Sequence, residues 1–430
     1  MSLMRIEDLF HFEKGILQSS KCTEGEFDFI TASSEWKTHN EFTHDCEALV
    51  FAAAASGSLG RTHYVNGKFI SSDLCFIITP KEPINFPIDL KFYHMIFNEF
   101  KNDIVKNTKA GTSKEAIGMK AFGNYKLPYF DIDKQIETKI QFVNMQHSKT
   151  ELNSELTHQL DLIKQLRQAF LREAMQGKLV KSTNKKETGH ELLAKIKAEK
   201  AQLIADKKLK KEKELSPIME DEIPFEIPEH WTWCRLGEIC TKIGSGSTPK
   251  GSNYSEIGKP FFRSQNVHDN GLVYEDIKFV SDEVQKQMNG TIVLSDDILL
   301  NITGGSMGRC ALVPTDFEEG NVSQHVCIIR PLSLDNIFLH KLVLSPYFQK
   351  LIFSSTTGAG REGLPKYNLE QFIIPLPPFH EQVQIVTKLE ELMAFCDGLE
   401  QSIKESQGYN EQLLQQVLRE ALQGNTVINE

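Results

Sequence analysis

Two short motifs combine small residues with an arginine. Gly-Ser-Leu-Gly-Arg at residues 57–61 returns as Gly-Ser-Met-Gly-Arg at 305–309, 248 positions later. One interpretation is a tight turn between strands, in which glycine supplies a positive φ angle. The other is a loop that presents serine and arginine to a phosphate group or a base edge. A turn alone explains the glycines but not the repeated arginine, so both interpretations stay open.

Other polar loops carry side chains suited to the same chemistry. Arg-Ser-Gln-Asn at 263–266 combines guanidinium and amide groups, which contact guanine and adenine edges through paired hydrogen bonds. The segments 244–250 and 357–361 are small-residue loops with cations, and 109–114 stands in the first copy where 357–361 stands in the second. Each could be a solvated surface loop, but their concentration in two repeated regions favours binding. The candidate contact residues are Ser33, Lys37, Ser58, Arg61, Lys109, Thr112, Lys114, Ser247, Thr248, Lys250, Arg263, Gln265, Asn266, Ser306, Arg309, Arg361 and Lys366.

Sequence signatures of catalysis are missing from the chain. It has no phosphate-binding loop, dinucleotide-binding turn, zinc-protease helix or serine-hydrolase elbow. Its eight cysteines include no Cys-x-x-Cys pair and match no zinc spacing. We therefore predict no catalytic residue, no metal site and no cofactor, and we expect free thiols in a reducing cytoplasm. The start of the chain lacks a signal peptide and no apolar run approaches about 18 residues, which predicts a cytoplasmic protein without membrane contact.

The repeated motif is one of three echoes at nearly one offset. Leu-Arg-Glu-Ala-Met-Gln-Gly at 171–177 returns as Leu-Arg-Glu-Ala-Leu-Gln-Gly at 418–424, and residues 70–75 are more faintly similar to 322–327. A period this long exceeds that of solenoid repeats, which run to about 20–50 residues. The pattern indicates two whole domains, each followed by its own helix.

Hydrophobic periodicity divides the chain into five parts. Short apolar runs bounded by Gly, Ser and Asp predict mixed domains over 1–131 and 231–378. Apolar residues recurring at three and four positions predict long helices over 132–177 and 379–425. The lysine-rich connector, 178–230, is expected to hold a helix over 191–214, whose lysines more often form a solvated face than a phosphate track. This predicts an α+β protein in which two long helices, paired along their apolar stripes, lie antiparallel and separate two domains related by a pseudo-two-fold axis.

Several segments resemble one known family. They are Ile-Pro-Leu-Pro-Pro-Phe-His-Glu-Gln at 374–382, Glu-Leu-Leu-Ala-Lys-Ile-Lys-Ala-Glu-Lys at 191–200, Glu-Ile-Pro-Phe-Glu-Ile-Pro at 222–228, Trp-Cys-Arg-Leu-Gly-Glu-Ile at 233–239 and Gly-Leu-Pro-Lys-Tyr at 363–367. In this order they are similar to the DNA specificity subunits of type I restriction–modification systems. In the first copy the pattern is weaker: Lys-Leu-Pro-Tyr at 126–129 stands where Ile-Ile-Pro-Leu stands at 373–376, and no Ser-Thr-Pro element precedes Phe29.

The resemblance implies two target-recognition domains, each reading one half of a split site in double-stranded DNA. It also implies that the long helices bind DNA methyltransferase (modification) subunits, and that a restriction and translocation subunit joins the larger assembly. The chain itself would be non-catalytic.

The charge of the chain is unusual for a DNA-binding protein. Its net charge is −10, and residues 229–378 hold 13 Lys and Arg against 16 Asp and Glu. Phosphate contacts must then come from a local cationic stripe and from partner subunits. A duplicated, non-catalytic adaptor that joins proteins through its helices is the alternative that this charge favours.

Overall fold

Two long helices occupy the segments with three- and four-residue apolar periodicity. α5 is Ile132–Met175 and α11 is Phe379–Gln423, and α11 continues through Gly398 and Gly408, although glycine disfavours a helix interior. α5 ends at Gly177, whose φ is +66°, with Gly177 N–H donating to Ala174 and Lys178 N–H to Glu173. This is the Schellman pattern, in which a left-handed residue satisfies the last helical carbonyls.

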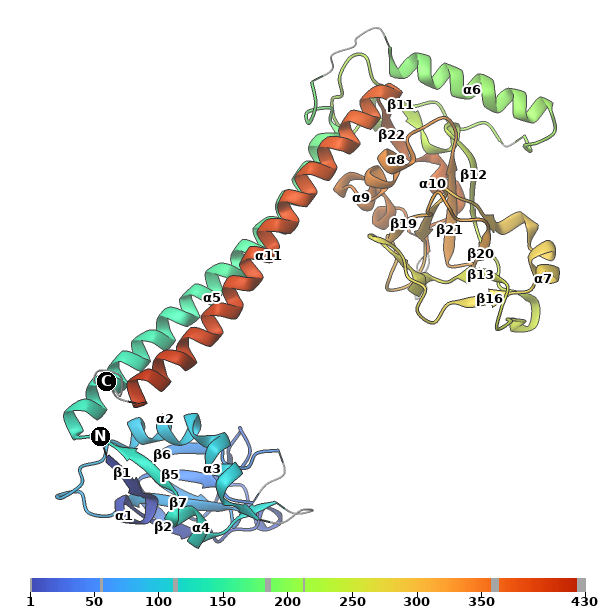
Figure 1. The fold of residues 1–430 in the computed structure, drawn as a ribbon. Helices are drawn as coiled ribbons and strands as arrows, with labels where there is room; N and C mark the ends of the chain where they lie inside the picture. Colours follow the sequence, from blue (N-terminus) through green and yellow to red (C-terminus); the bar gives the residue numbers. More distant parts are fainter. Residues whose placement is uncertain are drawn as a thin grey trace. The chain divides into compact units, whose positions relative to one another are not determined.

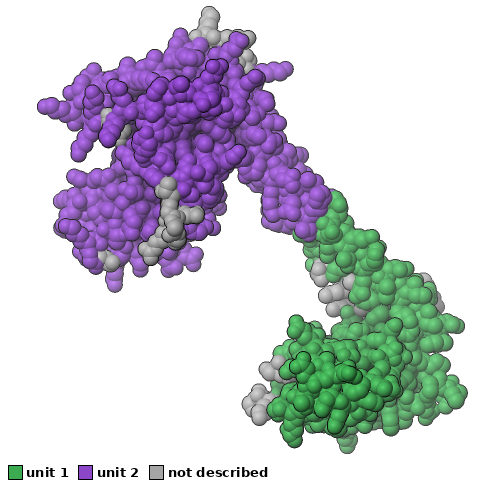
Figure 2. Space-filling model, turned by 180° about the vertical axis from the view of Figure 1, so that it is seen from behind, with its two compact units in different colours: residues 1–156, 405–430 green, residues 157–404 purple. Residues whose placement is uncertain are grey.

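The computed structural model describes residues 2–54, 57–110, 115–181, 187–211, 213–356 and 363–423. The chain divides into two units, 1–156 with 405–430, and 157–404, which Figure 2 distinguishes by colour. Each unit contains one mixed domain and part of each long helix. Within the described residues, no helix combines the length and apolar content needed to cross a membrane.

Unit 1 is built on a six-stranded sheet (Figure 1) in the order β2-β7-β5-β6-β3-β4, antiparallel except for the β3–β6 pair. Alternate residues of a strand point to opposite faces. Leu49 and Phe51 of β5 therefore join a core with α2, α3 and α4, whereas Ala48 and Val50 join a second core. The elements are β1 Ser2–Arg5, α1 Ile6–Leu9, β2 Phe10–Lys14, β3 Phe27–Ile30, β4 Lys37–His39, β5 His44–Ala52, β6 Thr62–Ser71, β7 Cys75–Pro80, α2 Leu90–Glu99, α3 Lys101–Thr108, β8 Lys109–Ala110, β9 Ala116–Ile117, α4 Met119–Asn124 and β10 Lys126–Tyr129, with a 3-10 turn η1 Ser19–Lys21.

Unit 2 contains two four-stranded sheets, in the orders β12-β21-β18-β19 and β16-β13-β20-β17. Ile298 and Leu300 of β18 join a core with α8 and α9, and Leu299 joins a second core with β13 and β20. The elements are α6 Gly189–Ala205, β11 Thr232–Arg235, β12 Cys240–Ser245, β13 Lys259–Phe262, β14 Val267–His268, β15 Gly271–Leu272, β16 Lys278–Val280, α7 Asp282–Gln287, β17 Ile292–Val293, β18 Ile298–Asn301, β19 Cys310–Leu312, β20 Gly320–Val322, β21 Val326–Pro331, α8 Asn336–Val343, α9 Pro346–Ser354, α10 Lys366–Gln371 and β22 Ile373–Leu376, with 3-10 turns η2 Glu220–Glu222, η3 Leu236–Glu238, η4 Lys250–Ser252, η5 Ser264–Asn266 and η6 Asn289–Thr291.

The connector helix is shorter than the sequence predicts. α6 begins at a capping box formed by Thr188 and Glu191 and ends at Ala205, nine residues before the predicted end at 214. Lys207 takes a φ of +59° there, and its N–H donates to Ile204 while Lys208 N–H donates to Leu203. Because glycine usually occupies this position in a Schellman motif, a lysine there carries no sequence signal for the end of the helix.

The two domains share equivalent side-chain hydrogen bonds as well as a similar strand order. His94 of α2 bonds through Nε2 to the carbonyl of Thr62 at 2.9 Å, and His340 of α8 bonds to that of Cys310 at 3.0 Å. In both domains this carbonyl begins the second strand of a hairpin, β5–β6 or β18–β19. The duplication expected from the sequence is therefore present in residues that its motifs do not include.

Candidate nucleic-acid interface

The Gly-Ser-Met-Gly-Arg motif of unit 2 forms the turn between β18 and β19. Gly304 and Gly308 have φ angles of +76° and +88°, and a side chain on Gly308 would lie 2.5 Å from Gln349 Oε1. The glycines are therefore required by the turn and by the approach of α9. Arg309 is exposed, and within the described residues its guanidinium has no hydrogen bond or ion pair. Backbone geometry thus accounts for the glycines and leaves the arginine available.

The Arg-Ser-Gln-Asn segment lies against this turn. Asn301 Nδ2 donates to the Ser264 carbonyl at 2.8 Å and to Ser306 Oγ at 3.1 Å, so one buried amide joins the two loops. Gln265 is exposed, and its backbone carbonyl bonds to His268 Nε2 at 3.0 Å. Its side-chain amide has no hydrogen bond to another described residue, which leaves it suited to a base edge.

Asn266 has a different role from the one expected. It is fully buried, its Oδ1 accepts from Arg263 N–H at 3.1 Å, and its Nδ2 donates to the carbonyls of Val273 and Glu275 at 3.0 and 3.2 Å. The donors and the acceptor of this buried amide therefore bond within the loop, so the amide cannot also contact a base in this conformation. Arg263 is only partly engaged in internal hydrogen bonds. Its Nη2 donates to the Asp276 carbonyl at 2.9 Å, and its buried Nε has no partner among the described residues.

The loop after β12 completes this surface. Ser247 N–H donates to Val322 at 3.1 Å, and Thr248 Oγ1 donates to Gln324 Oε1. The neighbouring His325 shares a hydrogen bond of 2.7 Å between its Nδ1 and Thr303 Oγ1, beside the β18–β19 turn. Lys250 is exposed at the end of the loop. We call residues 246–250, 263–266, 302–309 and 322–325 the recognition loops of unit 2.

The last candidates of unit 2 lie at the start of α10. Leu364 N–H donates to Ile302 at 2.9 Å, which places this segment beside the recognition loops. Lys366 forms an ion pair of 3.1 Å with Glu370 and remains half exposed. Arg361 lies outside the described residues.

In unit 1 the repeated arginine is used differently. Gly57 and Gly60 again have positive φ, at +77° and +82°, in the turn between β5 and β6. Arg61 Nη1 donates to the Ala32 carbonyl at 3.0 Å and to Ser58 Oγ at 3.4 Å. Arg61 therefore holds the loop after β3, the task that Asn301 performs in unit 2.

The remaining candidates of unit 1 surround this turn. Ser33 is exposed after β3, and Lys37 is exposed at the start of β4. Between them, Trp36 Nε1 donates to His63 Nδ1 at 3.3 Å, and burial lowers the pKa of His63 below its usual value. Lys109 is paired with Glu115 at 2.6 Å. Thr112 and Lys114 lie outside the described residues.

The structure adds one loop that the motifs did not identify. Gly15 N–H donates to Cys75 and Ile16 N–H to Ser71, as Gly246 does to Val326 and Ser247 to Val322. Gln-Ser-Ser-Lys at 18–21 is therefore the unit 1 counterpart of the loop after β12, and Ser19–Lys21 is exposed. The offset here is 231 residues rather than 248, and the residue types differ, so no sequence signal marked the equivalence. In the sequence, Gln324 and His325 stand out only as part of the fainter repeat at 322–327.

Comparison with known protein families also divides the chain into two similar regions. The profile of the type I restriction modification DNA specificity domain matches residues 1–162 and 228–406. Among curated proteins, the specificity subunit of the EcoAI type I restriction enzyme of Escherichia coli is 30% identical over 248 residues, or 56% of this chain and 41% of that protein. The EcoEI specificity subunit of Escherichia coli is 34% identical over 267 residues, or 60% of this chain and 43% of that protein. These matches thus span less than half the length of either relative.

Solved structures agree on the fold. The HsdS subunit from Thermoanaerobacter tengcongensis has a TM-score of 0.57 at 16% identity, with 99% of this chain and 97% of that chain covered. A chain from a structural study of complex assembly and conformational transition in the type I R-M system has a TM-score of 0.55 at 17% identity, covering 99% and 98%. With two profile matches over most of its length, the chain belongs to the family of type I restriction–modification specificity subunits.

Proposed function

We propose that this chain is the non-catalytic DNA-recognition subunit of a type I restriction–modification complex and that it reads a split site in double-stranded DNA. The observation that carries the proposal is the duplicated loop framework. Each domain places three loops beside one another: the loop after β2 or β12, the glycine turn, and the polar loop after β3 or β13. Equivalent backbone hydrogen bonds hold the first loop, and a side-chain bond from Arg61 to Ala32 or from Asn301 to Ser264 holds the polar loop. One half-sequence is assigned to each domain, 1–131 and 231–378.

The residues at equivalent positions differ, which supports two different half-sequences. Exposed Gln265 and Arg309 of unit 2 correspond in position to Ser33 and to the internally bonded Arg61 of unit 1. Gln and Arg read adenine and guanine through paired hydrogen bonds, whereas serine contacts bases with little selectivity. A shared frame with different side chains is what two independent readers of one duplex require.

The helices are proposed as the binding sites for methyltransferase subunits. Leu162 and Phe395 of unit 2 are 46% and 60% exposed, and Ile140 and Tyr409 of unit 1 are 52% and 69% exposed. Pairing between the helices therefore leaves apolar surface on both, suited to a partner protein. A restriction and translocation subunit would join through this larger assembly.

The helix arrangement within unit 2 agrees with an antiparallel spacer. Arg167 of α5 donates to Asp397 at 2.7 Å and to Glu400 at 3.1 Å, while Leu171 and Met175 share a core with Ile385 and Leu389. Successively higher residues of α5 therefore contact successively lower residues of α11, which is an antiparallel arrangement. We extend this to the spacer regions 132–177 and 379–425 and propose a pseudo-two-fold molecule whose domains meet DNA in opposite strand senses.

A domain exchange tests this function. Residues 231–378 are replaced by the matching domain of a relative with another specificity, and methylation is mapped in cells that carry the complete system. One half-sequence should change while the other stays. Alteration of both would refute independent reading, and methylation without any sequence preference would refute recognition by these domains. The adaptor alternative predicts no effect on sequence choice, and no comparison favours it.

A further inference from the structure

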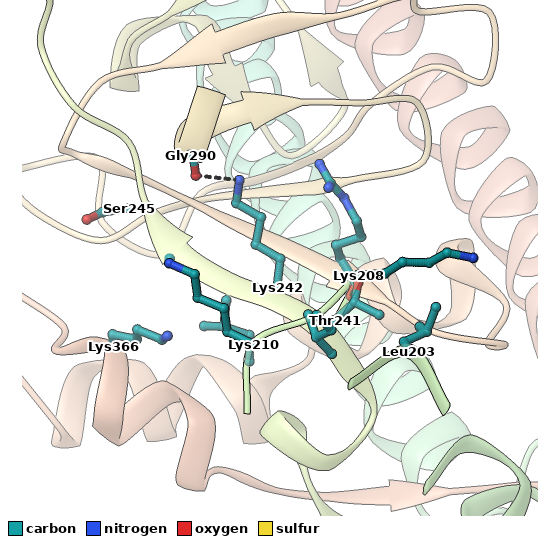
Figure 3. A pocket seen from close by; sticks show the side chains of 12 residues that line it. Leu203, Lys208, Lys210, Thr241, Lys242, Ser245, Gly290 and Lys366 are labelled. Carbon is teal, nitrogen blue, oxygen red and sulfur yellow. Dashed lines mark hydrogen bonds between the residues drawn. The ribbon is translucent and has the colours of Figure 1, made fainter. Parts of the chain in front are cut away.

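An open, cationic groove of about 700 Å³ lies along β12, the edge strand of its sheet (Figure 3). The segment after α6 forms one wall, and β12, β21 and the start of α10 contribute the others. No acidic side chain lines the groove among the described residues. The cations that line it are Lys208, Lys210, Lys242, Arg330 and Lys366.

The five cations are engaged to different degrees. Arg330 is held by the buried carboxylate of Asp297, with both contacts at 2.7 Å, and Lys242 donates to the Gly290 carbonyl at 2.8 Å. Burial lowers the pKa of Lys242, which a bound anion would oppose. Lys366 has Glu370 at 3.1 Å, as described above. These three groups build the floor and one wall of the groove.

The two connector lysines are the most available. Lys208 lies 3.9 Å from Asp206, and Lys210 is exposed without an ion pair or hydrogen bond among the described residues. Among the ion pairs of the described residues, the acidic partners of the lining cations are Asp206, Asp297 and Glu370, which are fewer than the five cations. The groove therefore has a local excess of positive charge in a unit whose recognition domain is acidic overall.

The turn at the end of α6 places Lys208 and Lys210 at the groove. The left-handed Lys207 turns the chain at the end of α6, and Lys208 and Leu209 N–H groups both donate to the Leu203 carbonyl, at 2.9 and 3.1 Å. The Cβ of any residue other than glycine disfavours this backbone conformation, because it approaches the following carbonyl oxygen. The turn brings Lys208 and Lys210 alongside β12, and Leu203 and Leu209 line the same groove.

The groove is continuous with the recognition loops. β12 leads from Ser245 directly into residues 246–250, and Ser245 lines the groove. On the opposite wall, Lys366 follows Gly363, which pairs with Thr303 of the recognition loops. A DNA strand that contacts the loops therefore has a cationic path along β12.

We propose that this groove binds phosphodiester groups of the DNA backbone beside the half-sequence, so that the connector is part of the DNA-binding surface. The proposal rests on DNA recognition by unit 2 and adds a contact that reads no bases. Lysine ammonium groups neutralise phosphates and release counterions, which gives affinity without sequence choice.

The test compares two double variants of the full chain. Lys208→Gln with Lys210→Gln removes the connector cations of the groove. Lys181→Gln with Lys195→Gln removes two exposed charges from the same connector that do not line the groove. Fluorescence anisotropy over a salt series measures binding to two duplexes. One contains the sequence that the complete system methylates, and the other contains a scrambled sequence. The groove variant should lose affinity for both duplexes by the same factor, with the salt slope reduced by about 1 for each lysine; the control should not.

Other outcomes overturn the proposal. If both double variants behave alike, the groove makes no phosphate contact, and recognition by the loops stands if Gln265→Ala still alters sequence choice. If Gln265→Ala and the domain exchange also change nothing, the proposed function itself fails. A third arm adds inorganic tripolyphosphate. If it binds the wild-type groove while DNA affinity is the same in the groove variant, the site takes free polyphosphate instead of DNA.

Discussion

Gln382 accepts a hydrogen bond from the Asp335 N–H, just as Gln135, 247 residues earlier, accepts one from the Asp89 N–H. Its Oε1 accepts from Asp335 N–H at 3.0 Å, and its Nε2 donates to the Pro377 carbonyl at 2.9 Å. In unit 1, Gln135 accepts from Asp89 N–H at 2.8 Å and donates to Phe130 at 2.7 Å. Both glutamines are fully buried at the start of a long helix, so in each unit one amide fixes the helix to its domain.

Replacing either glutamine by leucine should destabilise its own unit. Gln382→Leu leaves the Asp335 N–H and the Pro377 carbonyl without this partner, at a cost of about 1–3 kcal/mol per buried group. Chemical denaturation measures the loss, and hydrogen exchange should locate it in unit 2, with Gln135→Leu locating it in unit 1. Gln165→Leu, at an exposed position of α5, is the matched control and should change stability by less than about 0.5 kcal/mol. Equal effects of control and test variants would contradict the role of the buried amide.

Adjacent residues of one recognition loop should separate specificity from stability. Gln265→Ala should relax base choice by about 1–3 kcal/mol at one position without changing the melting temperature. Asn266→Asp keeps the shape of the side chain but removes the donors to Val273 and Glu275, so it should destabilise the loop and weaken binding to every sequence. Methylation mapping and thermal unfolding together distinguish the two. A stable Asn266→Asp protein with altered base choice would reverse the assignment.

The buried histidines should make stability fall with acid. Burial is the main cause that lowers the pKa of His340 from 6.5, while its bond to the Cys310 carbonyl opposes the shift. Because the folded imidazole has the lower pKa, protonation favours the unfolded chain. Stability is therefore full above about pH 6.5 and is lost as pH falls through the folded pKa. His340→Gln can retain a donor to the carbonyl without titrating, and it should flatten the decline of unit 2 between about pH 7 and 5. An unchanged decline would assign it to other groups.

Spacer length should set the gap between half-sequences. Leu171 and Met175 are buried in the core of unit 2, so an insertion beside Gly177 would disrupt that core. Four residues are better inserted after Gln159 of α5 and after Ile403 of α11, which preserves helical phase to within about 40° and adds about 6 Å. The methylated half-sequences should stay the same while the gap grows by about one or two base pairs, at about 3.4 Å each. Full methylation at the original spacing would show that the helices do not set the gap.

Local signals predicted most of the framework correctly. The helix predicted over 132–177 is α5, Ile132–Met175, because a three- and four-residue apolar period and a terminal glycine are local properties. The apolar runs at 48–51 and 298–301 lie in β5 and β18 for the same reason. α6 was predicted too long because its stop uses Lys207, a residue type that carries no local signal for a left-handed turn.

The interface was less predictable than the framework. Arg61 and Arg309 occupy the same place in one motif, yet Arg61 bonds to the Ala32 carbonyl and Arg309 faces solvent. Asn266 and Gln265 are neighbours with the same amide group, and only their burial separates a structural role from a candidate contact. Side-chain type defines what a residue can bond to, but its neighbours in space decide whether those bonds are already made.

The sequence by itself determined the duplication, the two long helices and the family, because periodicity and ordered motifs are properties of the chain alone. Tertiary structure decided which polar groups remain free. It paired Gln382 with Asp335, buried Asn266 and brought Lys208 and Lys210 beside β12 from a separate part of the chain. A hydrogen-bonding group needs a partner within about 3 Å, and residues far apart in sequence reach that distance only when the chain folds.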